Sequence, residues 1–265
     1  MEIDGAHILI TGGSRGIGAE LARQFTAKGA KVTIAARSAD ALATVAEPIG
    51  AKTLTVDLVD PAGPAGLIAR AEDGLGPVDV LVNNAGIDLV GPFVDMSAED
   101  VERIFTLNAV VPIELARQVI PGMLARGKGH IVNVSSLAGC AVLPGTAAYS
   151  ATKAALSHFT AGLRADFKGL PIGTTLVEVG VVPDTDMGST VMAYPPFGNS
   201  WNRLKKLGAV ADVSCERLCE AVVAGVASDR KHVRLPRRAA PIAMVAEAMR
   251  RVTEILISGV PARVE

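Results

Sequence analysis

Six short runs of apolar and β-branched residues recur along the chain, and they constrain its fold more than any other feature. They are 7–11 (HILIT), 31–36 (KVTIAA), 52–56 (KTLTV), 78–83 (VDVLVN), 130–135 (HIVNVS) and 172–179 (IGTTLVEV). Helix-length segments such as 16–28, 62–74, 99–126 and 149–168 separate them. Strands that are apolar on both sides and alternate with helices predict a parallel sheet covered on both faces. Right-handed crossovers then give a doubly wound, Rossmann-like α/β fold with its ligand crevice at the carboxyl ends of the strands.

No internal repeat or linker divides the 265 residues, so we expect one domain over 1–265. The segment at about 183–212 holds three prolines, the only tryptophan and the second tyrosine, which indicates a long, irregular substrate loop. Its apolar residues favour a bulky apolar substrate, and packing onto the protein's own surface is the alternative. They are Met187, Val191, Met192, Tyr194, Pro195, Pro196, Phe197 and Trp201.

A helical tail is predicted at about 239–258. Ile242, Val245, Met249, Val252 and Leu256 recur there at steps of three and four residues, as on one helix face. We expect this face to pack on the same domain or on a sister subunit. Peripheral membrane contact is the alternative, which the acidic residues of the polar face disfavour.

Charge and composition exclude several classes of function. The formal net charge of −1 gives no basic footprint for nucleic acid. Glycine, serine and proline interrupt the uncharged stretch 131–152, so no transmembrane segment is expected. Cys140, Cys215 and Cys219 lack metal-ligand spacing and predict reduced thiols in a cytoplasmic protein. The scattered histidines, His7, His130, His158 and His232, predict no metal site.

A glycine-rich loop, TGGSRGIG at 11–18, joins the first predicted strand to the first helix. Its spacing of Gly12, Gly16 and Gly18, with Gly13 in addition, differs from the GxGxxG fingerprint. Glycine still lets the backbone turn sharply and approach a pyrophosphate, and a helix N-terminus favours negative charge. The loop therefore predicts a dinucleotide site, with a simple tight turn as the alternative.

The end of the second strand indicates which dinucleotide binds. Many NAD-binding sheets place Asp or Glu there for the ribose 2′-hydroxyl. Here the position reads Ala36, followed by Arg37, and Arg15 stands in the first loop. Two guanidinium groups suit a 2′-phosphate, so we expect NADP(H); two solvated surface arginines are the alternative.

Taken together, the motifs resemble those of the short-chain dehydrogenase/reductase family, classical type. They are TGGSRGIG, Asp57 after the third strand, NNAG at 83–86, Asn108, Ser136 and YSATK at 149–153, in the family's order. The interval from Ser136 to Tyr149 selects Ser136 over Ser135. The resemblance implies a catalytic group of Asn108, Ser136, Tyr149 and Lys153. It also implies cofactor contacts from Gly12, Ser14, Arg15, Gly16, Ile17, Gly18, Arg37, Asp57, Leu58, Asn84, Gly86, Tyr149, Lys153 and Val182.

Tyr149 and Lys153 stand four positions apart and therefore share a helix face. A free phenol has a pKa of about 10. We expect the adjacent ammonium to lower the pKa of Tyr149 by roughly three units, so that the phenol acts as a proton donor. Ser136 would donate to the substrate oxygen, and Asn108 would hold a water on a proton path from Lys153.

Two departures from the family pattern concern the substrate side and the assembly. The usual Pro-Gly after the sixth strand is replaced by Val179 and Gly180, and HVRLP at 232–236 precedes a basic tail instead of a glycine-rich one. The helices at 99–126 and 149–168 correspond to those through which the family pairs, so we expect a homodimer or homotetramer.

The sequence thus predicts an NADP(H)-dependent oxidoreductase acting on an apolar carbonyl or secondary alcohol. A ketone, a 3-oxoacyl chain and a sterol-like substrate all remain open. The alternatives are a hydroxysteroid-type alcohol dehydrogenase running toward oxidation and a non-catalytic NADP(H)-binding regulator.

Overall fold

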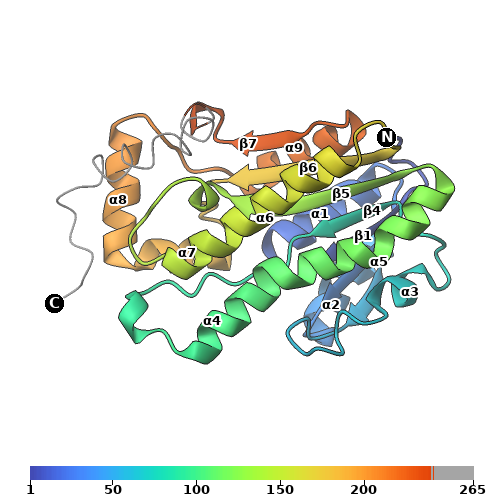
Figure 1. Cartoon of the computed structure of the whole chain (residues 1–265), viewed down its shortest axis with the longest axis horizontal. Helices are drawn as coiled ribbons and strands as arrows, with labels where there is room; N and C mark the ends of the chain where they lie inside the picture. The colour runs from blue at the N-terminus through green and yellow to red at the C-terminus, as the bar shows by residue number, and fades with distance from the viewer. Residues whose placement is uncertain (240, 242–265) are drawn as a thin grey trace.

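A twisted parallel sheet runs through the middle of the molecule in the computed structural model, which describes residues 1–239 and 241 (Figure 1). The strand order is β3-β2-β1-β4-β5-β6-β7, and every neighbouring pair is parallel. From β1 the chain adds β2 and β3 on one side of that strand, and it then adds β4 to β7 on the other side. The strands are β1 His7–Thr11, β2 Lys31–Ala36, β3 Lys52–Thr55, β4 Val80–Asn83, β5 Gly129–Ser136, β6 Ile172–Val179 and β7 His232–Leu235. The predicted doubly wound fold is confirmed.

Helices cover both faces of this sheet. One face carries α1 Gly16–Ala27, α2 Ala39–Ala46 and α9 Cys215–Ala227. The other carries α3 Leu67–Glu72, α5 Val111–Arg126 and α6 Ala147–Asp166. The remaining helices are α4 Ala98–Phe105, α7 Asp186–Ala193 and α8 Pro195–Lys206, with short 3₁₀ turns η1 Glu47–Ile49, η2 Phe93–Asp95, η4 Leu137–Gly139 and η5 Arg237–Ala239. A π-helical turn, η3 Thr106–Val110, joins α4 to α5.

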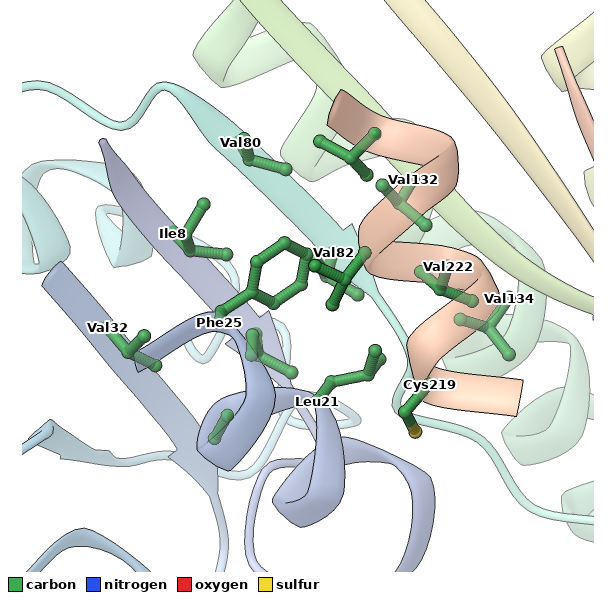
Figure 2. Packing of buried hydrophobic residues seen from close by; sticks show 14 of the residues in the cluster. Ile8, Leu21, Phe25, Val32, Val80, Val82, Val132, Val134, Cys219 and Val222 are labelled. Atoms are coloured by element: carbon green, nitrogen blue, oxygen red, sulfur yellow. The ribbon is translucent and has the colours of Figure 1, made fainter. Parts of the chain in front are cut away.

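Alternate strand residues fill the two layers of the core. Ile8 and Ile10 of β1 point toward α1, whereas Leu9 between them packs in the opposite layer. Figure 2 shows the first layer, where Phe25 of α1 and Val222 of α9 meet the strand valines. Burying such a side chain contributes roughly 1.5–3 kcal/mol. This core fixes the strands whose carboxyl ends carry the polar motifs.

The segment 183–212 differs from the predicted irregular loop, because most of it is helical. Thr185 caps α7 by accepting a hydrogen bond from the Gly188 N–H at 3.1 Å, and α8 begins with Pro195 and Pro196. Proline is compatible with a first helical turn, where the missing N–H has no intrahelical partner. The prolines therefore mark a helix start rather than a loop.

Three smaller differences concern element bounds. Of the predicted helix 62–74 only α3 is helical. Gly66, directly before it, has φ +70, which is not a right-handed helical conformation. The predicted helix 99–126 is interrupted by η3. HVRL forms a seventh strand beside β6. The tail helix predicted at 239–258 lies, apart from residues 239 and 241, outside the described residues. Among the helices within 1–239, none is both long and apolar enough to cross a membrane.

Candidate active site

A cavity of about 850 Å³ lies along the carboxyl ends of the strands. Its lining includes loop residues after β1, β2, β3 and β4, the end of β5 and the segment after β6. At the other end it reaches α7 and α8. The crevice predicted for the doubly wound sheet is therefore present. Every predicted site residue except Gly18 and Asn108 lines this cavity, and these two support residues that do.

Three glycines of the loop 11–18, namely Gly12, Gly13 and Gly18, are packed so closely that a Cβ would clash. A Cβ on Gly18 would lie 2.2 Å from the Gly12 carbonyl oxygen, and Gly12 itself has φ +68. The Asn84 side-chain amide donates to the carbonyls of Thr11 and Gly12 at 3.0 and 3.2 Å. The N-cap residue of α1, Arg15, makes no side-chain capping bond among the described residues. The first N–H groups of α1 thus face the cavity without a capping side chain, which fits a phosphate.

The next two strands contribute the adenosine end of the predicted site. Arg37 follows β2 and is exposed at the cavity wall, as the 2′-phosphate prediction requires. Asp57 accepts a hydrogen bond from the Val59 N–H at 3.0 Å, and the adjacent Leu58 is buried in the wall. Arg15 instead pairs with Asp186 of α7 at 2.6 Å, with both side chains largely exposed. Arg37 forms no ion pair with a residue in the described part of the chain.

Tyr149, Lys153 and Ser136 meet at the centre of the cavity wall. The Lys153 ammonium lies 5.7 Å from the centroid of the Tyr149 ring and donates to the Val134 carbonyl at 2.9 Å. The Ser136 hydroxyl donates to the Val179 carbonyl at 3.3 Å, and it lies close enough to Tyr149 to act on the pKa of the phenol. The neighbouring Ser135 hydroxyl donates to the Lys153 carbonyl at 3.0 Å. Both serines line the cavity, and the choice of Ser136 over Ser135 stays a prediction.

Burial dominates the acid–base properties of this group. It raises the pKa of Tyr149 to about 12, against an opposing contribution from the Ser136 hydrogen bond. It lowers the pKa of Lys153 to about 8. The direction for Tyr149 is opposite to the predicted one, because desolvation disfavours the phenolate and Lys153 is not among the causes of the shift. The phenol consequently holds its proton at neutral pH, which is the form a proton donor needs.

Asn108 sits in the π-helical turn η3 and is fully buried. Its amide accepts from the Ile87 N–H at 3.0 Å and donates to the Ile87 carbonyl at 2.8 Å. It also donates to the Thr152 hydroxyl at 3.1 Å. A Cβ on Gly86 would lie 3.0 Å from the Asn108 Oδ1 and 3.5 Å from the Lys153 Nζ. The side chain therefore fastens the backbone after Gly86, close to Lys153; π-turns often occur at functional sites.

The substrate end of the cavity is apolar. Phe197 and Trp201 of α8 stack with ring centroids 6.2 Å apart and are almost fully buried. The Trp201 indole N–H donates to Asp212 at 2.9 Å. Val182, expected by the nicotinamide, is buried in the lining, and its carbonyl accepts from the Thr185 hydroxyl at 2.8 Å. The apolar side chains predicted in a loop thus form part of a packed helical wall.

Sequence reasoning missed several polar residues of the lining, among them Asp88, Thr185 and Asp186. Thr185 followed by Asp186 has the pattern of a helix cap with an acidic first turn, and that pattern could have revealed α7. Asp88, directly after NNAGI, belongs to no motif. Nothing in the sequence alone places it in the same cavity as Tyr149.

Comparisons with known proteins agree with this geometry. The model of the short chain dehydrogenase family matches residues 6–194. The ketoacyl reductase HetN of Nostoc sp. is 35% identical over 190 residues, covering 70% of this chain and 66% of that protein. The gluconate 5-dehydrogenase of Gluconobacter oxydans is 31% identical over 223 residues, covering 79% of this chain and 87% of that protein. The chain spans 66% and 58% of the length of HetN and of the bovine dehydrogenase/reductase SDR family member 7B.

Solved structures give the same result. A short-chain dehydrogenase from Streptomyces avermitilis superimposes with a TM-score of 0.79 at 26% identity, covering 94% of both chains. One from Sphingobium yanoikuyae, in complex with NADPH, has a TM-score of 0.76 at 27% identity and covers 98% of both chains. Fold, motifs and relatives coincide, and the chain belongs to the short-chain dehydrogenase family of oxidoreductases, which bind a nicotinamide cofactor.

Proposed function

We propose that this protein is an NADP(H)-dependent oxidoreductase that transfers hydride between nicotinamide and an apolar carbonyl or secondary alcohol. One observation carries the proposal: Tyr149, Ser136 and Lys153 meet on the wall of a cavity that also holds the glycine loop and Arg37. The relatives support it, since one is named an NADP-dependent 3-hydroxy acid dehydrogenase and two solved neighbours contain NADP or NADPH.

The cofactor would be held by groups at the carboxyl ends of β1 to β4. The N-terminus of α1 and the glycine loop would bind the pyrophosphate, and Arg37 would bind the 2′-phosphate. Asp57 and Leu58 would border the adenine, while Ser14, Ile17 and Gly86 line the path toward Lys153 and Val182. When bound, the cofactor supplies the hydride and, once oxidised, a positive charge.

The chain's own residues would handle the substrate oxygen and the proton. Ser136 donates a hydrogen bond to the oxygen as negative charge develops there. Tyr149 is protonated at neutral pH and transfers its proton to that oxygen. The Lys153 ammonium, near the ring, stabilises the resulting phenolate and helps return a proton to it. Asn108 fixes the backbone beside Lys153 and so keeps this arrangement in place.

We extend the proposal to the assembly and the cellular location of the protein. We propose that it is a single-domain homodimer or homotetramer in the cytoplasm. Exposed apolar side chains support self-association: Phe93 and Val94 of η2 are 60% and 74% exposed, and Val110 beside α5 is 56% exposed. Light scattering on the purified protein should give at least twice the monomer mass.

The test of function is oxidation of NADPH with a panel of apolar ketones and 3-oxoacyl esters, followed by its absorbance. We expect ketone-dependent oxidation that is faster with NADPH than with NADH. Tight NADPH binding without oxidation by any ketone, and without the reverse reaction on the matching alcohols, would instead identify a non-catalytic regulator.

A further inference from the structure

Asp88 lines the same cavity, and one of its two carboxylate oxygens has no hydrogen-bond partner among the described residues. Its Oδ2 atom is buried and accepts no hydrogen bond from the described residues. Its carboxyl group forms no ion pair with a residue in the described part of the chain. Burial raises the pKa of this carboxyl group. The backbone N–H groups of Asp88 and Leu89 act in the opposite direction, but burial is the larger effect. A carboxylate withdrawn from water is unfavourable unless a donor meets it.

The backbone holds Asp88 in place from both sides. On one side Asn108 binds both the N–H and the carbonyl of Ile87. On the other side the Gly91 N–H donates to the Gly145 carbonyl at 3.0 Å, just before α6. Leu89 between them has φ +36, a conformation that residues other than glycine rarely adopt. Such a strained position persists only where its surroundings impose it, and it is typical of ligand-binding segments.

Asp88 and Tyr149 line the same cavity. The negative charge of Asp88 contributes to the raised pKa of Tyr149, after burial of the ring. Among the described lining residues, the other acids are engaged: Asp186 pairs with Arg15, and Asp57 accepts from the Val59 N–H. Apolar side chains of the same cavity include Leu137, Leu143 and Val191. The cavity that holds the proposed proton donor thus also holds a carboxylate oxygen without a hydrogen-bond partner.

We propose that Asp88 is a specificity residue that accepts a hydrogen bond from a hydroxyl or protonated amino group carried next to the reacting carbonyl of the substrate. This inference rests on the proposed carbonyl reduction and narrows its substrates to apolar hydroxy ketones or amino ketones, with the corresponding diols or amino alcohols in reverse. The apolar remainder would lie against α8.

The test compares three matched ketones: acetophenone, 2-hydroxy-1-phenylethanone and 2-amino-1-phenylethanone. The last two carry the hydroxyl or amino group on the carbon next to the carbonyl. The quantity measured is the ratio of kcat/KM for each substituted ketone to that for acetophenone. The intrinsic reactivity of each ketone does not depend on the enzyme variant. A change in this ratio between variants therefore reports the protein's contact with the substituent. Asp88→Leu removes the acceptor at similar volume, and Asp88→Asn keeps a neutral acceptor. Asp95→Asn, at an exposed aspartate of η2, is the matched control.

We expect Asp88→Leu to lower the ratio for at least one substituted ketone by about tenfold or more, as for loss of a hydrogen bond to a charged group. Asp95→Asn should leave both ratios unchanged. If wild type prefers the amino ketone and Asp88→Asn loses that preference, the donor is an ammonium group; if wild type prefers the hydroxy ketone and Asp88→Asn keeps that preference, the donor is a hydroxyl group. Equal ratios in wild type and Asp88→Leu, with all three ketones reduced, would overturn the inference.

Ligand binding gives a second readout that is independent of turnover. Trp201, the chain's only tryptophan, lies in the cavity wall, so its fluorescence reports ligand binding. If wild type oxidises NADPH with none of the ketones, the proposed reduction fails. Tighter binding of a substituted ketone to wild type than to Asp88→Leu or Asp88→Asn would still support the role of Asp88. Equal Kd values would contradict it.

Discussion

The part of the cavity proposed to bind the cofactor (the cofactor half) depends strongly on close backbone packing, whereas the part proposed to bind the substrate (the substrate half) is lined mainly by apolar side chains. The cofactor half comprises the loop 11–18 and the residues after β2, β3 and β4, where Asn84 hydrogen-bonds the carbonyls of Thr11 and Gly12. The substrate half comprises α7, α8 and the separate apolar cluster around Phe197, Trp201 and Leu204. Backbone sites tolerate few residue types, but a packed apolar wall tolerates many. The first half therefore leaves a motif in the sequence, and the second does not.

The proposed catalytic group lies on the wall of the same cavity, and Tyr149→Phe removes its proposed proton donor. We expect turnover to fall by at least ~10²-fold, because the proton donor is lost while the ring remains. The NADPH Kd should stay within about twofold, since the glycine loop and Arg37 are untouched. Stopped-flow turnover and a fluorescence titration measure the two quantities. Near-normal turnover would refute the assignment of Tyr149.

Gly18→Ala tests the cofactor half alone. The new Cβ would meet the Gly12 carbonyl at 2.2 Å, so backbone must move. We expect the NADPH Kd to rise by about tenfold or more, because such a displacement of a binding loop is costly. The matched control is Gly162→Ala in the middle of α6, where a Cβ would meet nothing within 4 Å. Equal Kd values for the two variants would mean that the glycine loop does not bind the cofactor.

Arg37→Ser tests the choice of dinucleotide. We expect the Kd for NADPH to rise by roughly tenfold, the value of one charge-assisted hydrogen bond, while that for NADH changes little. Arg217→Ser on α9, an exposed arginine away from the cavity, serves as the control. A proportional weakening of both dinucleotides in Arg37→Ser would argue against a contact with the 2′-phosphate.

Trp201→Phe tests the substrate half and should give the smallest effect. The variant keeps an aromatic ring but loses the N–H bond to Asp212. We expect the KM for an apolar ketone to rise by about fivefold, as for one hydrogen bond of ~1 kcal/mol, with the NADPH Kd unchanged. A comparable loss of NADPH affinity would show that the two halves are not independent.

Sequence patterns predicted the sheet, the glycine loop and the residues that meet at the cavity because each depends on local chemistry. Gly18 has no alternative residue at its position, and Tyr149 and Lys153 share a helix face by their spacing alone. The pattern also identified the apolar content of 183–212, but not its helices. Pro195 and Pro196 are compatible with a loop or with a first helical turn, and the packing of Phe197 and Trp201 in the apolar cluster is a tertiary feature that the sequence pattern does not show.

The electrostatics of the site could not be predicted in the same way. The pKa of Tyr149 depends on how deeply the ring is buried, which outweighs the proximity of Lys153. Likewise, the sequence did not predict that the Asn108 amide hydrogen-bonds Ile87 and Thr152, and its role in holding a water stays a prediction. Both outcomes follow from tertiary packing, which brings together segments distant in sequence.

The central claim is that one cavity brings a hydride donor and the Tyr149 proton to the same carbonyl group. The most direct measurement uses NADPH deuterated at the transferable nicotinamide position and a ketone that the panel identifies as a substrate. Mass spectrometry of the alcohol should find one deuterium bound to the former carbonyl carbon. A product without the label, or label that exchanges with water, would contradict the account.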